Sequence, residues 1–370
     1  MATEAARAVL TIDLRAIVEN YRRLQREAPG VEVAAVVKAD GYGLGLLEVG
    51  QVLWQAGCRS FFVAHPGEGV ALRTALAEAA IYVLHGLQGD TGADLADAAL
   101  LPVLNHPGEL TSYAALGRAR ERRLPAALQI DTGMCRLGLA QGELERLARA
   151  DLDALELRLI MSHLACAEEP DNPMNQEQLA RFERLRPPLP GAPASLANSS
   201  GMFLGPAFQF QLCRPGVALY GVNPTPDRAN PMAPVVTLEA PVLQVHEVSV
   251  PGSVGYGAVH RTRAGARIAT IPVGYADGYL RAAGERATAR IAGHEVPLAG
   301  RVSMDLISLD VSALPADAVR PGVTVELIGG PDGVDRLAAA AGTIGYEVLT
   351  RLGSRFARRY IRPAAKKPGS

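Results

Sequence analysis

Short apolar runs alternate with helical patterns through roughly the first 215 residues of the chain. Each run holds three to five apolar residues and is bounded by polar or turn residues, which is typical of a buried strand. The runs lie at 34–37, 61–64, 81–84, 102–104, 126–130, 157–161, 194–197 and 210–213. Eight strands separated by helices predict an α/β fold of the (β/α)8 TIM-type barrel class. A doubly wound parallel sheet would show the same alternation.

The pattern changes after about residue 237, where alternating strands follow one another without long helices. The expected strands are 242–248, 267–273, 288–291, 302–309 and 324–328. This texture predicts a mostly antiparallel β domain. A boundary is expected in 224–234, which contains four prolines. We therefore predict a barrel over 11–230 and a β domain over 235–365, which the strand 7–12 could join, with no internal repeat beyond the βα alternation.

Composition excludes several classes of function. The chain has 370 residues, 48% of them hydrophobic, so it can build a sizeable core. The 37 basic and 38 acidic residues nearly balance, which argues against a nucleic-acid or membrane partner. The four cysteines form no Cys-x-x-Cys pair, so neither a disulfide framework nor a metal site is expected. With no signal peptide or apolar span, we expect a cytoplasmic protein.

Polar residues follow directly on several of the predicted barrel strands. They are Lys38, Asp131, His163, Asn198 and Arg214. The carboxyl ends of barrel strands converge on one face, so these side chains are expected to share one site. Burial would disfavour the charged form of Lys38 and make its amine a usable base or nucleophile. The alternative for this lysine is a solvated side chain at a strand end.

A turn after the last barrel run supports a more specific reading. Arg214-Pro215-Gly216-Val217 is suited to aim backbone N–H groups at a phosphate. A phosphate beside a buried lysine suggests pyridoxal 5′-phosphate (PLP) as the cofactor. The alternative is an arginine that merely fixes a loop carboxylate.

Several segments together resemble the alanine racemases, a family of PLP-dependent enzymes with a barrel and a β domain. The matching segments are Lys38-Ala39-Asp40-Gly41-Tyr42-Gly43, Asp131 to Gly138, Asn198-Ser199-Ser200-Gly201 and Arg214-Pro215-Gly216. The resemblance implies that Lys38 carries the cofactor and that Arg214 faces its pyridine nitrogen. An arginine cannot accept the proton that a carboxylate would hold there. The residues implied at the phosphate are Tyr42, Ser199, Gly216, Val217 and Tyr346.

The same resemblance implies that Arg136 binds the substrate carboxylate, for which a guanidinium fork is well shaped. Two departures from the family pattern occur nearby. Cys135 stands where a glycine is usual, and Gln129 stands where many members have a lysine that becomes carbamylated. A neutral glutamine cannot supply the negative charge of a carbamate, so how Arg136 is oriented stays open.

Tyr256 is implied to be the second acid/base, delivered across the interface of a homodimer, with His163 beside it. Tyrosine is a poor base at neutral pH unless its neighbours stabilise the phenolate. A turn aromatic and a satisfied core histidine are the plain alternatives for these two residues. From the partner, Met304 is implied to bind the substrate, and Tyr275, Arg301 and Asp305 are implied to close the substrate entrance.

The resemblance implies an alanine racemase that interconverts L- and D-alanine by a two-base proton transfer and supplies D-alanine for peptidoglycan. A broad-specificity or serine racemase of the same fold is the nearest alternative, and a catabolic role is equally open. An amino-acid decarboxylase of this architecture fits less well, because its nitrogen partner is a glutamate where this chain has Arg214. A PLP-carrying barrel protein would lack the region that bears Tyr256 and Met304.

Overall fold

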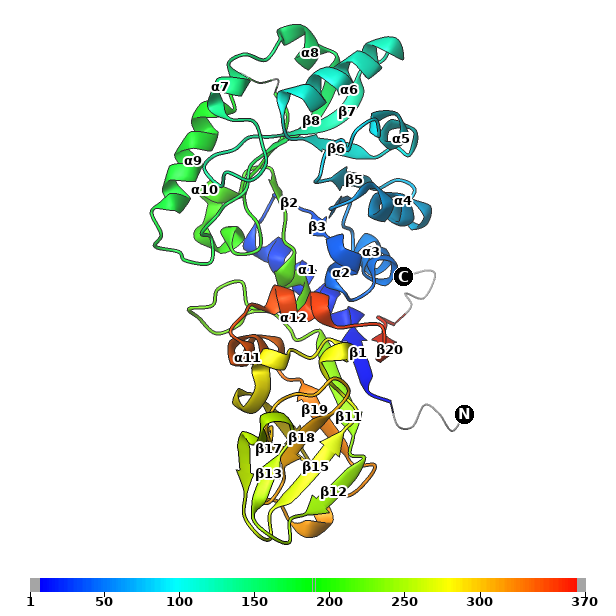
Figure 1. Ribbon diagram of the computed structural model, residues 1–370. Helices are drawn as coiled ribbons and strands as arrows, with labels where there is room; N and C mark the ends of the chain where they lie inside the picture. Colours follow the sequence, from blue (N-terminus) through cyan, green and yellow to red (C-terminus); the bar gives the residue numbers. More distant parts are fainter. Residues whose placement is uncertain (1–6, 188, 190, 365–370) are drawn as a thin grey trace. The chain divides into compact units, whose positions relative to one another are not determined.

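The computed structural model describes residues 7–187, 189 and 191–364 (Figure 1). Its contacts divide the chain into two compact units. The first unit holds Val18–Leu219 and Pro224–Asn230. The second holds the residues up to Ile17, the short stretch Tyr220–Asn223 and the chain from Pro231 onwards. The domain limits 11–230 and 235–365 stay a prediction, and residue 365 lies outside the described residues.

Seven strands of the first unit pair in parallel and in chain order. They are β3 (Ala35–Val36), β4 (Ser60–Val63), β5 (Ala80–Val83), β6 (Leu101–Leu104), β7 (Leu124–Gln129), β8 (Leu155–Met161) and β9 (Ala194–Ser195). All four residues of β4 and of β6 are buried, as expected for strands covered on both faces.

An eighth strand closes this sheet into a barrel. β10 (Leu212–Cys213) pairs in parallel with β2 (Glu32–Val33), the segment just before β3. The Ala34 N–H, just after β2, extends this pairing by donating to the last carbonyl of β10 at 2.9 Å. On the other side of β10, the Arg214 N–H donates to the Ala197 carbonyl, just after β9, at 2.9 Å. The barrel prediction is thus confirmed, because a doubly wound sheet would leave two open edges.

Helices separate the barrel strands and surround them (Figure 1). The helices that begin within or cover the barrel are α1 (Leu14–Glu27), α2 (Lys38–Tyr42), α3 (Leu46–Gln55), α4 (Pro66–Ala75), α5 (Gly92–Asp97), α6 (Pro107–Ala119), α7 (Gln141–Leu144), α8 (Arg149–Asp153), α9 (Met174–Leu185), η1 (Gly201–Leu204), α10 (Pro206–Gln209) and η2 (Val217–Tyr220). One core cluster joins Leu110 and Tyr113 of α6 to Leu104, Leu128 and Leu155 on the strands. Burial of such side chains is the main stabilising term of the barrel.

The second unit contains three small sheets. A six-stranded sheet runs in the order β17 (His294–Pro297), β16 (Thr288–Ile291), β19 (Thr324–Ile328), β11 (Val236–Pro241), β1 (Val9–Asp13) and β20 (Ala357–Ile361). A three-stranded sheet runs in the order β12 (Gln244–Glu247), β15 (Arg267–Ile271) and β18 (Ile307–Asp310), and β13 (Gly252–Val254) pairs with β14 (His260–Thr262). Only the β1–β20 pair is parallel among these, so the mostly antiparallel domain is confirmed for the described residues.

The predicted strand 302–309 is wrong in its first half. Only Ile307–Asp310 forms a strand, while Val302 to Asp305 form a loop that hydrogen-bonds with a neighbouring turn. Short helices complete the unit: η3 (Tyr256–Ala258), η4 (Tyr275–Asp277), η5 (Arg281–Arg286), η6 (Ala316–Ala318), α11 (Gly333–Ala341) and α12 (Gly345–Arg351). No helix within the described residues is long and apolar enough to cross a membrane.

Candidate active site

Lys38 lies at the start of a left-handed turn. It follows β3 after one residue and opens α2, in which Ala39, Asp40 and Gly41 have φ of +54°, +54° and +62°, and Tyr42 has φ of +56°. Each non-glycine residue in this region costs about 1–2 kcal/mol. Neighbouring groups must therefore hold the turn, and one of them is the Asp40 carboxylate, which accepts the Leu46 N–H at 2.8 Å.

The surroundings of Lys38 favour its neutral amine. Burial lowers the pKa of Lys38, and the positive charges of Arg136 and Arg214 lower it further. The carboxylate of Glu68 acts in the opposite direction and raises this pKa. The net direction is downward, so a larger fraction of the amine is unprotonated near neutral pH than in an ordinary lysine. The predicted chemistry of this side chain agrees with its environment.

Arg214 is buried, with 4% of its surface exposed, and its guanidinium meets only neutral groups. Its Nε donates to the Ser195 hydroxyl at 2.8 Å, and its Nη2 donates to the carbonyls of Ser162 and Leu196. No ion pair within the described residues involves it. Burial lowers the pKa of Arg214 to about 10, so it stays protonated at neutral pH. The alternative reading, an arginine fixing a loop carboxylate, is therefore wrong.

His163 lies against Arg214, with Nδ1 3.5 Å from Nη1 of that guanidinium. Burial lowers the pKa of His163 well below its usual range, and the charges of Arg214, Arg136 and Lys38 act in the same direction. The imidazole is consequently neutral at physiological pH. The four side chains thus influence one another electrostatically, as the convergence of strand ends predicts.

Four of the five residues expected at a phosphate, all except Tyr346, lie at the turn after β10. A Cβ at Gly216 would lie 2.2 Å from the Tyr42 hydroxyl, so the backbone can approach that closely only at a glycine. The Ser199 hydroxyl accepts the N–H groups of Gly216 at 2.9 Å and Ala218 at 3.2 Å. Val217 is buried directly beside them. Burial raises the pKa of Tyr42, which keeps its hydroxyl neutral and able to donate.

An orphaned hydroxyl supports a ligand at this turn. The Ser200 hydroxyl, next to Ser199, is buried and has no hydrogen-bond partner. Buried polar groups in folded proteins almost always have partners. A phosphate group among these hydroxyls and N–H groups would supply acceptors, so the residues present fit the phosphate of PLP.

Arg136 lies on a loop that its own neighbours shape. The Asp131 carboxylate accepts the N–H groups of Gly133 at 2.8 Å and Cys135 at 3.2 Å. Gln129 is buried, and its amide donates to the Leu137 carbonyl at 3.0 Å. Gln129 therefore braces the backbone next to Arg136 instead of pairing with the guanidinium. Cys135 adopts a φ of +54°, which accounts for a glycine being usual there.

A second set of predicted residues gathers in the second unit. Tyr256 opens η3 and is 72% exposed. A Cβ at the next residue, Gly257, would lie 3.0 Å from the Arg301 guanidinium. The N–H of Tyr275 donates to the Ser303 carbonyl at 3.0 Å, which brings the loop bearing Met304 against η4.

Asp305 and Tyr346 are the other two predicted site residues of this unit. Asp305 pairs with Arg355 at 2.8 Å, and Arg355 also pairs with Asp277 at 3.1 Å. Tyr346 lies in α12 of the second unit, whereas the other residues expected at the phosphate lie in the barrel. The phosphate-binding role of Tyr346 stays a prediction.

Sequence reasoning missed Glu68, whose carboxylate connects two loops of the barrel. Its Oε1 accepts the Ala39 N–H at 2.6 Å, and its Oε2 accepts the Ala64 N–H at 2.8 Å. A signal was present, because His-Pro-Gly-Glu occurs at 65–68 and again at 106–109. The expectation of no repeat beyond the βα alternation was therefore too coarse.

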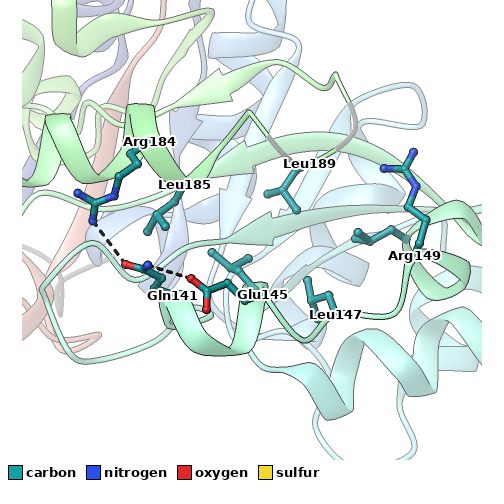
Figure 2. Close-up of a pocket in the computed structure, with 9 residues that line it drawn as sticks. Gln141, Glu145, Leu147, Arg149, Arg184, Leu185 and Leu189 are labelled. Carbon is teal, nitrogen blue, oxygen red and sulfur yellow. Dashed lines mark hydrogen bonds between the residues drawn. The ribbon is translucent and has the colours of Figure 1, made fainter.

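A separate groove lies outside these groups. It has a volume of about 350 Å³ and is lined by leucines and polar residues from α7, α8 and α9 (Figure 2). The Gln141 amide links the polar groups of the groove. Its oxygen accepts a hydrogen bond from Arg184 at 3.5 Å, and its nitrogen donates one to Glu145 at 2.9 Å. None of the predicted site residues lines it, so we assign the chemistry to the barrel and not to this groove.

The fold and the barrel site define a class: a (β/α)8 barrel enzyme with a PLP-type lysine and an arginine in place of a carboxylate at the site. The family descriptions "Alanine racemase, N-terminal domain" and "Alanine racemase, C-terminal domain" match residues 12–224 and 235–360. The chain belongs to the alanine racemase family, and it is accordingly a PLP-dependent racemase.

Individual relatives agree over nearly the whole chain. A catabolic alanine racemase of Mesorhizobium japonicum is 50% identical over 360 residues, covering 96% of this chain and 94% of the relative. An alanine racemase of Rhodospirillum rubrum is 49% identical, with 96% of each chain covered. The crystal structure of an alanine racemase from Bartonella henselae with covalently bound pyridoxal phosphate is 40% identical, has a TM-score of 0.93, and covers 96% of this chain and 100% of its own.

Proposed function

We propose that this protein interconverts L- and D-alanine with PLP carried on Lys38. One observation carries the proposal: a lysine with a lowered amine pKa lies among a buried, unpaired arginine and a neutral histidine at the mouth of a barrel. The bound cofactor supplies the electron-withdrawing group that makes the α-hydrogen of an amino acid acidic. Our further assignments concern the chain's own residues.

Lys38 removes or returns the α-proton on one face of the substrate, and burial together with the nearby arginines lowers the pKa of its amine toward the range of a usable base. Arg214 donates hydrogen bonds and accepts no proton. It would therefore place a cation beside the cofactor's ring nitrogen, where a carboxylate would keep that nitrogen protonated. Arg136 binds the substrate carboxylate from a loop held by Asp131 and Gln129. Tyr42, Ser199, Gly216 and Val217, with Tyr346, bind the phosphate.

Tyr256 handles the proton on the opposite face, and we propose that it does so in the site of a second copy of this chain. The support is its exposure together with that of apolar neighbours in the same unit. Met304 is 54% exposed and Leu306 is 42% exposed. Large exposed apolar groups of this kind mark interfaces. In a homodimer they would close the substrate entrance together with Tyr275, Arg301 and Asp305.

The physiological role we propose is supply of D-alanine for peptidoglycan in the cytoplasm. The four cysteines are free thiols, which suits a reducing compartment. The relative from Mesorhizobium japonicum carries the name catabolic, so degradation of alanine is the competing role. The test is expression in a bacterium that requires added D-alanine. Growth without added D-alanine would support the proposed supply role, and absence of growth would count against it.

The activity itself is tested with purified protein. L-alanine, L-serine and L-lysine are incubated separately with protein and PLP, and the products are separated by chirality. We expect racemisation of alanine at the highest kcat/KM. A higher kcat/KM for serine would replace the proposal by the serine racemase alternative, and loss of carbon dioxide would indicate a decarboxylase.

A further inference from the structure

The left-handed turn after Lys38 needs an external support. Three of its residues, Ala39, Asp40 and Tyr42, carry side chains at positive φ. Such conformations persist only where the surroundings over-determine them. Hydrogen bonds within the turn, such as Gly43 N–H to the Ala39 carbonyl at 2.7 Å, close it locally. They do not fix its direction relative to the barrel.

Glu68 supplies that connection. It lies in the first turn of α4, and its carboxylate accepts four backbone N–H groups from two loops. Ala39 and Asp40 donate at 2.6 and 3.4 Å, and Ala64 and His65 donate at 2.8 and 3.2 Å. Charge-assisted bonds of this kind are roughly twice as strong as neutral ones. The carboxylate thus ties the turn that begins with Lys38 to the end of β4.

The chain contains a matched carboxylate at a different loop. Glu109 occupies the same position in the second His-Pro-Gly-Glu sequence, at the start of α6. It accepts the N–H groups of Asn105 at 2.6 Å and Leu87 at 3.0 Å. Glu109 therefore performs the same helix capping and loop bridging, but the loop it holds bears none of the proposed site residues.

We propose that Glu68 is a positioning residue for the racemase reaction, holding the turn that aims Lys38 and placing a negative charge beside its amine. The inference rests on the proposed role of Lys38. Other charged or titratable groups acting near this amine are Arg136, Arg214, His163 and the pair His65 and His85, whose rings meet edge to face. Of the groups that act on the Lys38 pKa, Glu68 is the one that raises it.

The test compares Glu68→Gln with Glu109→Gln in the PLP-loaded full-length enzyme. Glutamine keeps the shape but loses the charge and one acceptor oxygen. Because Glu109 is the more buried of the two, Glu109→Gln should lower Tm at least as much as Glu68→Gln, by a few degrees in each case. Glu68→Gln should lower kcat/KM by roughly tenfold or more, since small misplacements of a reacting group are costly, while Glu109→Gln stays within about twofold of wild type.

Two readouts separate positioning from simple capping. Circular dichroism in the absorption band of the bound cofactor reports its orientation, and it should change in Glu68→Gln only. The pH midpoint of the cofactor's absorption spectrum should move to lower pH in Glu68→Gln. Without the carboxylate of Glu68, the protonated nitrogen of Lys38 is easier to deprotonate.

Equal changes of kcat/KM, dichroism and spectral midpoint in both variants would overturn the proposal and leave Glu68 a helix cap. Unchanged values in Glu68→Gln would overturn it as well. The wild type distinguishes these failures from failure of the proposed function. Wild-type protein that racemises alanine and holds PLP at Lys38 upholds the function whatever Glu68 does, whereas wild-type protein that does neither refutes the function itself.

Discussion

The two groups of proposed site residues differ in burial and in hydrogen bonding. The barrel group consists of Lys38, Arg136, His163 and Arg214 with the phosphate residues. Arg214 is 4% exposed, and each nitrogen of its guanidinium has a hydrogen-bond partner. In the β-domain group, formed by Tyr256, Tyr275, Arg301, Met304 and Asp305, Tyr256 is 72% exposed. In the first group Arg214 is buried and Lys38 and His163 are half-buried, while Arg136 is exposed. The second group presents its reactive side chain to the outside.

This difference has an electrostatic consequence. Burial and neighbouring cations shift the pKa values of Lys38 and His163 downwards in the barrel group. The β-domain group presents an exposed phenol, and in general a phenol serves as a base only where neighbouring groups stabilise its anion. A neutral histidine and two arginines are available in the barrel group for that purpose. We therefore regard each group as half of a site.

Replacing the lysine of the barrel group should have the largest effect. Lys38→Ala removes both the attachment point of PLP and one proton base, so racemisation should fall to background. Borohydride reduction of wild type, followed by peptide mass analysis, should find the cofactor on Lys38. The other lysines, Lys366 and Lys367, lie outside the described residues, and cofactor fixed to either of them would refute the assignment. An unchanged Tm in the variant shows that folding is not the cause.

Replacing the tyrosine of the β-domain group should act on one face of the substrate. Tyr256→Phe should lower racemisation in both directions by roughly 10²–10⁴-fold, the usual worth of a general base. In deuterated water, Lys38 alone should still exchange the α-hydrogen of one enantiomer, which the family resemblance makes D-alanine. Equal loss of exchange from both enantiomers would make Tyr256 a residue that only orients the substrate.

Gln129 tests how firmly the barrel group is braced. Gln129→Leu keeps the side-chain volume but removes the hydrogen bond to the Leu137 carbonyl, worth about 1 kcal/mol. KM for alanine should rise roughly fivefold with a smaller change in kcat, because the loop of Arg136 loosens. Wild-type activity should not respond to bicarbonate at constant pH and ionic strength, since no lysine at 129 can be carbamylated. A fall in kcat with constant KM would contradict this role.

The smallest effect concerns pH and stability. The folded protein holds the pKa of His163 below the value near 6.5 of the unfolded chain. As pH falls below about 6.5, the unfolded chain binds a proton that the folded protein does not, so the free energy of unfolding decreases, by at most about 1.4 kcal/mol per pH unit. His163→Asn should lose less stability between pH 7 and 5 than wild type. If wild type and His163→Asn lost the same free energy of unfolding between pH 7 and 5, the assignment would be contradicted.

The barrel and the barrel group could be predicted from the sequence because one rule generates both. Apolar runs define the strands, and the polar residue after each run must lie at the shared end of the barrel, as Lys38, His163 and Arg214 do. The first half of strand 302–309 could not be predicted. Its backbone bonds to the turn at Tyr275, which a pattern of residue types does not reveal.

Glu68 and the left-handed turn could not be predicted from the sequence for a related reason. Ala39 disfavours positive φ, and Asp40 tolerates it only somewhat better than most residues. A carboxylate 28 or more positions away supports the conformation by accepting their N–H groups. The repeated His-Pro-Gly-Glu sequence marked the two carboxylates. It did not show that one of them holds a turn with a reactive lysine.

The central claim is that a working site combines the barrel group of one subunit with the β-domain group of another. It is tested most directly by mixing Lys38→Ala and Tyr256→Phe chains that carry different tags and isolating the mixed dimers before and after equilibration. A mixed dimer would have one site with both Lys38 and Tyr256 intact, so an equilibrated mixture of two nearly inactive parents should regain about a quarter of wild-type activity. Isolated mixed dimers no more active than the parents would show that Lys38 and Tyr256 do not meet across an interface.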